Sequence, residues 1–254
     1  MKSALFAALY QTSATIGNHL GNKRKFMNLG YAGESSLDVQ AIDKVDTHHI
    51  SLYMKLLDMI PGCRENGKNW SALEVGCGRG GGCYVMKKYF HIPDITGVDL
   101  SSANIKIATK LVHSVDFISS DAITFTTPKK FDIILNLESS HRYSSRLAFF
   151  KKVASMMKID AYFVFGDMIR KHELEEVEKM FQESGLKIIK VETANEGVVN
   201  SIKQNSPKQY PVATTFPFLF PKRIHSFCVT IHSIPFNKLK NGEVLYNLYL
   251  LKKA

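Results

Sequence analysis

The chain has 254 residues, of which 45% are hydrophobic and 22% charged, with 16 Gly and 8 Pro. This composition is typical of a globular protein and excludes collagen-like, disordered and repeat sequences. No apolar run reaches the roughly 18 residues of a membrane-spanning helix. The apolar stretch 3–9 is short and poorly flanked for a signal peptide, so we expect one face of a helix there and a cytoplasmic protein.

Lys and Arg outnumber Asp and Glu by 33 to 23, which gives a net charge of +10. The basic residues occur as scattered pairs, such as Lys87-Lys88 and Lys151-Lys152, and no long basic stripe or RNA-binding aromatic motif accompanies them. Nucleic acid is therefore a disfavoured partner, whereas an anionic cofactor remains compatible with the charge.

The four cysteines are Cys63, Cys77, Cys83 and Cys228. They form no C-x-x-C pair, and no histidine stands at zinc-binding spacing beside them. We therefore expect free thiols in a reducing compartment, and neither a disulfide framework nor a metal site.

Periodicity predicts an alternation of helices and strands. A helix is expected over residues 45–59, ended by Pro61-Gly62. The following elements are strand 71–75, a glycine-rich turn over 76–82, helix 84–89, strand 95–98, helix 102–112, strands 115–118 and 131–137, helix 146–157, strand 161–166, helix 173–184 and strand 186–193. Such alternation predicts a parallel, doubly wound sheet that binds ligands at the carboxyl ends of its strands.

The last sixty residues break this rhythm. A helix over 197–204 is followed by a Pro- and Phe-rich stretch over 211–221, and strand 244–251 closes the chain. We therefore divide the chain into an N-terminal helical lid (1–45), a core (46–194), an inserted cap (195–240) and a final strand that completes the core (241–254).

Six aromatic residues crowd the cap: Tyr210, Phe216, Phe218, Phe220, Phe227 and Phe236. One interpretation is an apolar pocket for a lipid, polyketide or aromatic acceptor. The other is a small cap core that packs on the sheet.

The strongest local signal is the glycine-rich turn after the first strand. Its glycines allow sharp turning and close approach of the backbone to a ligand, and the turn ends at a helix N-terminus. Asp99 closes the next strand, where a carboxylate can accept both hydroxyls of a ribose. Asp121, after the third strand, is placed to meet an adenine amino group.

This arrangement resembles the class I S-adenosylmethionine-dependent methyltransferases. The motif E-x-G-x-G-x-G is carried by Glu74, Gly76, Gly78 and Gly80, and Asp99 and Asp121 follow it. The resemblance implies an α/β, Rossmann-like, doubly wound seven-stranded sheet with an antiparallel last strand, N-terminal helices and a cap inserted before that strand. The residues that it implies for S-adenosylmethionine binding are Tyr31, Glu74, Gly76, Cys77, Gly78, Gly80, Asp99, Leu100, Asp121, Ala122 and Asn136.

A competing interpretation is a nicotinamide-dependent oxidoreductase. Gly76, Gly78 and Gly81 also satisfy G-x-G-x-x-G, with an acidic residue about twenty positions further on. Glu74 before the first glycine, the helix before the first strand and the insertion before the last strand favour the methyltransferase.

Two further motifs narrow the resemblance. Residues 27–31 read M-N-L-G-Y, and residues 136–143 read N-L-E-S-S-H-R-Y. Together they resemble the small-molecule branch that includes sterol, tocopherol and phthiotriol-type methyltransferases. The chain lacks the [DN]-P-P-[YF] motif of many base N-methyltransferases at this position.

Three side chains in these motifs, and Asp167 further along the chain, have alternative interpretations. His141 is either a general base that takes the proton of a substrate hydroxyl or a wall of the pocket. Glu138, the second candidate catalytic residue, contacts substrate or cofactor, or orients His141. Tyr31 closes over the cofactor or packs against the first helix. Asp167, at the end of the fifth strand, faces the substrate or caps the next helix.

The sequence thus predicts methyl transfer, favouring oxygen, to a small, apolar, hydroxyl-bearing metabolite. An RNA methyltransferase and a cofactor-binding pseudoenzyme that acts as an interaction module are the remaining alternatives, and a homodimer is left open.

Overall fold

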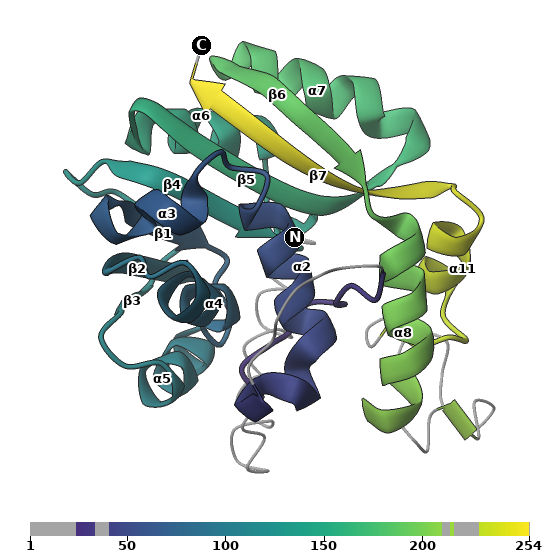
Figure 1. The fold of residues 1–254 in the computed structure, drawn as a ribbon. Helices are drawn as coiled ribbons and strands as arrows, with labels where there is room; N and C mark the ends of the chain where they lie inside the picture. The colour runs from purple at the N-terminus through teal and green to yellow at the C-terminus, as the bar shows by residue number, and fades with distance from the viewer. Residues whose placement is uncertain (1–23, 34–40, 210–213, 216–228, 254) are drawn as a thin grey trace.

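The computed structural model describes residues 24–33, 41–209, 214–215 and 229–253. Its centre is one seven-stranded sheet in the order β3-β2-β1-β4-β5-β7-β6 (Figure 1). The strands are β1 (Ser71–Val75), β2 (Asp94–Asp99), β3 (Asp116–Ser119), β4 (Phe131–Leu137), β5 (Met157–Arg170), β6 (Leu186–Thr193) and β7 (Val244–Lys253). The strands β1 to β5 pair in parallel, and β7 runs antiparallel between β5 and β6. The predicted sheet and its antiparallel last strand are confirmed.

The helices and helical turns follow the predicted alternation. They are η1 (Ala41–Asp46), α2 (Thr47–Leu57), α3 (Cys63–Asn66), η2 (Gly67–Asn69), α4 (Gly81–Tyr89), α5 (Ser102–Leu111), η3 (Ser140–Arg142), α6 (Arg146–Met156), η4 (Lys171–Glu173), α7 (Leu174–Glu183), α8 (Asn195–Gln209) and α11 (Ile234–Lys240). In the described part of the chain, no helix has the length and apolar character to cross a membrane.

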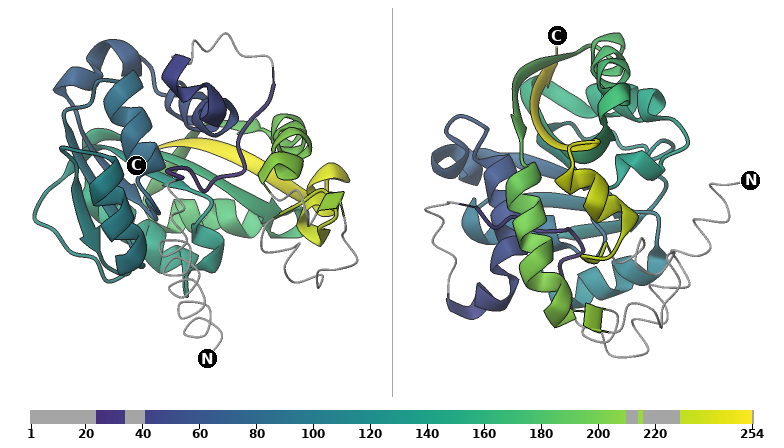
Figure 2. Two further views of the ribbon diagram at one scale, coloured as in Figure 1. Left: turned by 90° about the horizontal axis from the view of Figure 1, so that it is seen from below. Right: turned by 90° about the vertical axis from the view of Figure 1, so that its right-hand side faces the viewer.

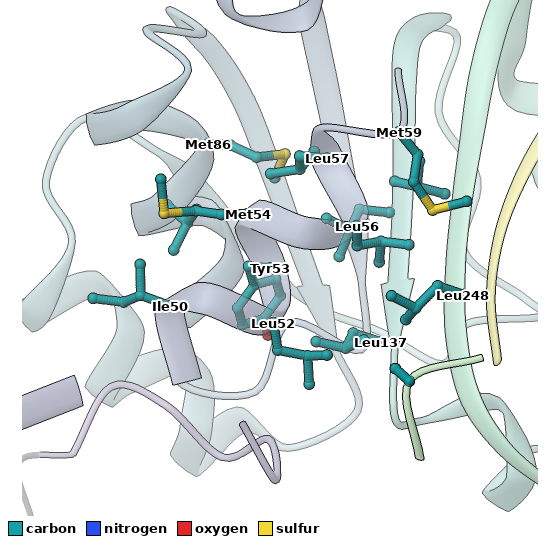
Figure 3. Packing of buried hydrophobic residues seen from close by; sticks show 14 of the residues in the cluster. Ile50, Leu52, Tyr53, Met54, Leu56, Leu57, Met59, Met86, Leu137 and Leu248 are labelled. Atoms are coloured by element: carbon teal, nitrogen blue, oxygen red, sulfur yellow. The ribbon is translucent and has the colours of Figure 1, made fainter. Parts of the chain in front are cut away.

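The sheet separates two apolar clusters because side chains alternate between the two faces of a strand. Ala72 of β1 belongs to the cluster under α2 and α4, whereas its neighbour Leu73 belongs to the cluster under α6 and α7. Figure 3 shows part of the first cluster, where Leu56 and Leu57 of α2 lie among Met86, Leu137 and Leu248.

Several element boundaries differ from the prediction. β5 is much longer than the predicted 161–166, because its second half continues to pair with β7 as far as Arg170. α4 begins already at Gly81, inside the predicted turn, and α8 extends the predicted 197–204 at both ends. The four-residue helix α3 was not predicted.

The segments inserted around the sheet lie at one end of it. α8 and α11 lie side by side between β6 and β7 in the chain (Figures 1 and 2). The predicted helix over 3–9 and the cap aromatics Tyr210, Phe216, Phe218, Phe220 and Phe227 lie outside the described residues. Phe236 of α11 is buried in the first cluster, so it belongs to a core and not to an open pocket.

Candidate active site

The glycine loop between β1 and α4 has a backbone that favours glycine. Gly76, Gly78 and Gly80 adopt φ values of 75°, 52° and 82°, in the left-handed region that side chains disfavour. A Cβ on Gly76 would lie 2.9 Å from the Tyr143 hydroxyl oxygen, and closer still to Ser139. The N–H groups of Gly76 and Cys77 donate to the Val98 carbonyl oxygen at 2.7 and 3.0 Å, which ties the loop to β2.

Glu74 holds the end of this loop against the first turn of α4. Its Oε2 accepts the Cys83 N–H at 2.7 Å, and its Oε1 accepts the Tyr53 hydroxyl at 3.1 Å. Burial raises the pKa of Glu74 to about 7, although these two hydrogen bonds act in the opposite direction. A side chain on Gly82 would collide with this carboxylate, so glycine is needed there as well.

Asp99 sits at the carboxyl end of β2, directly beside the loop. Its side chain is buried, and its oxygens accept the Gly78 N–H at 2.9 Å and the Ser101 N–H at 2.8 Å. Each carboxylate oxygen can accept more than one hydrogen bond. Asp99 therefore fixes the loop and can still accept the hydroxyls of a ribose.

The ends of β2 and β3 bring the next two predicted residues to the same edge. Asp99 is in register with Ser119, just before Asp121. The exposed Asp121 carboxylate accepts the N–H groups of Ile123 and Thr124 at 2.8 and 3.2 Å, while Ala122 is buried. Leu100 stays 40% exposed, as an apolar side chain beside a ligand site would.

Asn136 is fully buried at the end of β4, and one of its polar atoms lacks a hydrogen-bond partner among the described residues. Its Nδ2 donates to the Val75 carbonyl oxygen and to Ser139 Oγ, both at 2.7 Å. Its Oδ1 has no hydrogen-bond partner among the described residues. A buried acceptor without a donor is uncommon in a folded protein. This atom, the glycine backbone and Asp99 together fit a ligand with amino and ribose groups, as S-adenosylmethionine has.

His141 and Asp167 form the second half of the site. His141 Nδ1 lies 2.6 Å from Asp167 Oδ1, and the His141 N–H and the Ser140 hydroxyl donate to Oδ2 at 3.0 and 2.6 Å. Burial alone would raise the pKa of Asp167, but His141 and Ser140 outweigh it and lower the pKa. Because an ionised carboxylate only accepts hydrogen bonds, Nδ1 carries the hydrogen of this contact.

Asp167 was missed as the partner of His141. The available signal was the topology, since β4 and β5 pair in parallel with Leu137 opposite Gly166. Residues that directly follow this pair on the two strands therefore meet at one edge of the sheet.

Glu138 does not orient His141, which corrects one of the two predicted roles. Its carboxylate accepts the Leu29 N–H at 3.0 Å and the Tyr246 hydroxyl at 2.6 Å, while Asp167 holds the histidine. Burial raises the pKa of Glu138 to about 7 against the effect of these two donors. Its backbone has φ = 52°, an unfavourable value for a side chain with a Cβ.

Residues 24–33 run along the glycine loop and end at α8. Phe26 packs on Gly81, Met27 lies near Gly78, and the Leu29 carbonyl oxygen accepts the Ser201 hydroxyl at 2.7 Å. The Tyr31 ring packs on Gly197 of α8, with Lys55 Nζ 5.3 Å from its centroid. These contacts place Tyr31 at α8, and its role over the cofactor stays a prediction.

A cavity of about 770 Å³ opens beside His141. It is lined by Ser140, His141, Tyr143, Ser144, Ser145, Arg146, Leu147, Met168, Arg170, Glu173, Met180, Ile234, Pro235, Lys238 and Val244. Tyr143 joins it to the glycine loop, because its hydroxyl lies against Gly76, where a Cβ would come within 2.9 Å, and also 3.1 Å from Asn136 Nδ2. The two halves of the site are therefore adjacent.

Thiols and metal ligands add nothing to this site. Cys63, Cys77 and Cys83 are free and buried, and Cys228 lies outside the described residues. Within the described ranges, no group of three His, Cys, Asp or Glu side chains could hold a metal ion.

A Rossmann-like sheet with an antiparallel β7, a glycine-rich first loop and an aspartate at the end of β2 is the arrangement expected of a class I methyltransferase. A family profile described as a methyltransferase domain matches residues 73–165. The "Probable phthiotriol/phenolphthiotriol dimycocerosates methyltransferase 2" of Mycobacterium ulcerans is 30% identical over 188 residues, which are 72% of this chain and 71% of that protein. The chain belongs to the class I S-adenosylmethionine-dependent methyltransferases, in their small-molecule branch.

Other relatives and structures agree with this assignment. The phthiotriol/phenolphthiotriol dimycocerosates methyltransferase of Mycobacterium tuberculosis is 27% identical over 92% of this chain and 87% of that protein. The fatty-acid O-methyltransferase of Mycolicibacterium smegmatis is 28% identical over 71% of this chain and 66% of that protein. An O-methyltransferase from a polyketide synthase of Brevibacillus brevis, solved with S-adenosyl-L-homocysteine, has the same fold, with a TM-score of 0.64 and 16% identity over 91% of this chain and 85% of that chain. S-adenosylmethionine is the cofactor, and the nicotinamide interpretation is set aside.

Proposed function

We propose that the protein O-methylates a small, largely apolar metabolite, whose hydroxyl lies against His141 in the 770 Å³ cavity. The observation that carries this proposal is the 2.6 Å contact between His141 Nδ1 and the buried Asp167 carboxylate at the cavity wall. Curated relatives named for phthiotriol and fatty-acid methylation support a lipid-like acceptor.

The chemistry assigned to His141 is general-base catalysis. S-adenosylmethionine supplies an electrophilic methyl group when bound, so the protein mainly orients the acceptor and excludes water. Nε2 of His141 takes the hydroxyl proton as the oxygen becomes methylated. Asp167 holds the ring in the required tautomer and stabilises the positive charge that the ring gains.

The glycine loop would hold the cofactor beside this base. In this proposal Asp99 binds the ribose, Asp121 and Ala122 flank the adenine, and Asn136 Oδ1 accepts a hydrogen bond from the cofactor's amino group. Glu74 contributes indirectly, since its carboxylate holds the first turn of α4.

The division into lid, core, cap and final strand is part of the proposal. Leu29 and Tyr31 of the N-terminal segment contact Glu138 and α8, respectively, next to both halves of the site. The cytoplasmic location and the homodimer stay predictions.

Thermal unfolding with S-adenosylmethionine, S-adenosylhomocysteine or NADH tests the cofactor site. A ligand at about a hundred times its Kd adds roughly 2.7 kcal/mol, which raises Tm by several degrees. We expect a rise with both sulfur ligands and none with NADH.

A screen of apolar alcohols for methyl transfer then tests the acceptor. Cofactor binding without turnover on any alcohol would favour the pseudoenzyme. Salt-dependent RNA binding with RNA methylation would favour the RNA alternative.

A further inference from the structure

The cavity beside His141 is lined by both apolar and charged side chains. Its apolar lining comes from Leu147 of α6, Met168 of β5, Met180 of α7, Pro235 of α11 and Val244 of β7. Five elements thus provide a surface suited to a hydrocarbon or ring system.

Three cations line the same cavity against a single carboxylate. Arg146, Arg170 and Lys238 come from α6, β5 and α11, while Glu173 is the one acidic side chain in the lining. Glu173 pairs with Arg170 at 2.9 Å and with Arg146 at 3.9 Å. Lys238 has no ion pair with any carboxylate of the described residues. The lining therefore has two more cations than carboxylates, and the buried Asp167 carboxylate behind His141, whose pKa Arg146 also lowers, offsets one of them.

This excess is not expected for a cavity that takes a neutral acceptor. Like charges that face one half-enclosed space repel each other more strongly than on an open surface, because less water screens them. An anion in the cavity would remove that repulsion. Arg146 is only 17% exposed, which places one of these charges well inside the wall.

Resting on the proposed function, we propose that the acceptor is an amphipathic anion. Its apolar body lies in the cavity, its hydroxyl faces His141, and a separate carboxylate or phosphate group binds Lys238 with Arg146 and Arg170. Lys238 is then a specificity-determining residue that selects anionic over neutral acceptors of the same length.

Binding to the full chain with saturating S-adenosylhomocysteine tests this proposal without requiring the true acceptor. The probes are decyl phosphate, decanol and inorganic phosphate, measured by titration calorimetry. We expect decyl phosphate to bind about tenfold more tightly than decanol, and inorganic phosphate to bind far more weakly than decyl phosphate. Equal affinity for decyl phosphate and decanol would overturn the proposal.

Reversing the charge of Lys238 tests whether this residue binds the anionic group. Lys238→Glu should weaken decyl phosphate binding about tenfold and leave decanol and S-adenosylhomocysteine binding unchanged. Lys240→Glu is the matched control, because Lys240 lies on the same helix but is exposed and outside the cavity lining. Equal losses in the two variants would contradict the assignment to Lys238.

Two further measurements distinguish failure of the acceptor proposal from failure of the proposed function. If Lys238→Glu does not fold, raising the salt on the unmodified chain should weaken decyl phosphate binding but not decanol binding, since salt screens only the charge contacts. Absence of S-adenosylhomocysteine binding would overturn the proposed function itself. Intact S-adenosylhomocysteine binding without preference for the anion would overturn only the inference about the acceptor.

Discussion

The glycine loop and the His141 cavity are adjacent but are built in different ways. The loop takes its shape from nine consecutive residues, 74–82, whose backbone is fixed mainly by hydrogen bonds to β2 and within the first turn of α4. The cavity is assembled from α6, β5 and α7, which follow one another in the chain, together with α11 and β7, which come much later. In this protein the cofactor half of the site is therefore encoded locally, whereas the acceptor half depends on the packing of the whole sheet.

The two buried aspartates differ in the groups that they bind. Asp99 accepts two backbone N–H groups, from Gly78 in the loop after β1 and from Ser101. Asp167 accepts two side-chain groups, the His141 ring and the Ser140 hydroxyl, from the segment after β4. The first carboxylate thus stabilises a turn, and the second holds a side chain that can exchange a proton.

The largest effect is expected at the acceptor half. His141→Ala should lower kcat about 10²- to 10⁴-fold, because a positioned base is lost. Asp167→Asn should lower kcat by a similar factor and change the pH profile, since the ring loses its tautomeric control. Steady-state kinetics on an identified acceptor measure both variants.

The control for these variants is His113→Ala, since His113 is exposed and lies outside the cavity lining. S-adenosylhomocysteine should bind all three variants as it binds the unmodified protein. Full turnover by His141→Ala would show that the ring is only a wall of the pocket.

The next effect is expected at the cofactor half. Asp99→Ala should weaken S-adenosylhomocysteine binding by roughly 1.5–3 kcal/mol, the contribution of hydrogen bonds to a charged group. Asp94→Ala is the matched control, because Asp94 begins the same strand and pairs only with Lys129 at the surface. Calorimetry that finds equal affinities for the two variants would refute the placement of the ribose.

Glu138, which binds Leu29 and Tyr246, should affect the pH dependence of stability. Its pKa of about 7 lies above the ordinary value of 4.5, so its contribution to stability is complete below pH 4.5 and is lost as the pH rises through 7. Glu138→Gln should remove this loss, so the variant gains on the unmodified protein by roughly 3 kcal/mol between pH 4 and 8, since each pKa unit corresponds to about 1.4 kcal/mol.

Urea unfolding at several pH values measures this difference, with Glu176→Gln on the exposed face of α7 as the control. A difference that does not change with pH would mean that Glu138 is ionised throughout.

The succession of strands along the chain and the glycine loop were predictable, because short stretches of sequence indicate both. Glycine is the residue that a backbone with positive φ favours, so the glycines of the loop indicate its turns directly from the sequence. The aspartate that follows the next strand is likewise recognised from its position alone. Apart from β3 and β4, which follow each other directly, the strands alternate with helices in a pattern that the periodicity of apolar residues already indicates.

The partners of Glu138 and His141 were not predictable in this way. Glu138 binds Leu29, 109 residues earlier, and Tyr246, 108 residues later. Lys238 reaches the cavity from an insertion between the last two strands. Such contacts depend on how the cap and the N-terminal segment pack on the sheet, which no short sequence pattern records.

The smallest effect is expected at Asp121, where the cofactor half meets solvent. Its Oδ1 already accepts two N–H groups of its own turn, and the side chain is exposed, so water competes for any further hydrogen bond. Asp121→Ala should weaken S-adenosylhomocysteine binding only a few-fold, about 0.5–1.5 kcal/mol. Asp121→Asn keeps an acceptor for both the turn and an adenine amino group and should bind nearly as well as the unmodified protein. Calorimetry that ranks Asn below Ala would mean that the negative charge, and not the hydrogen bond, is what the adenine end of the site requires.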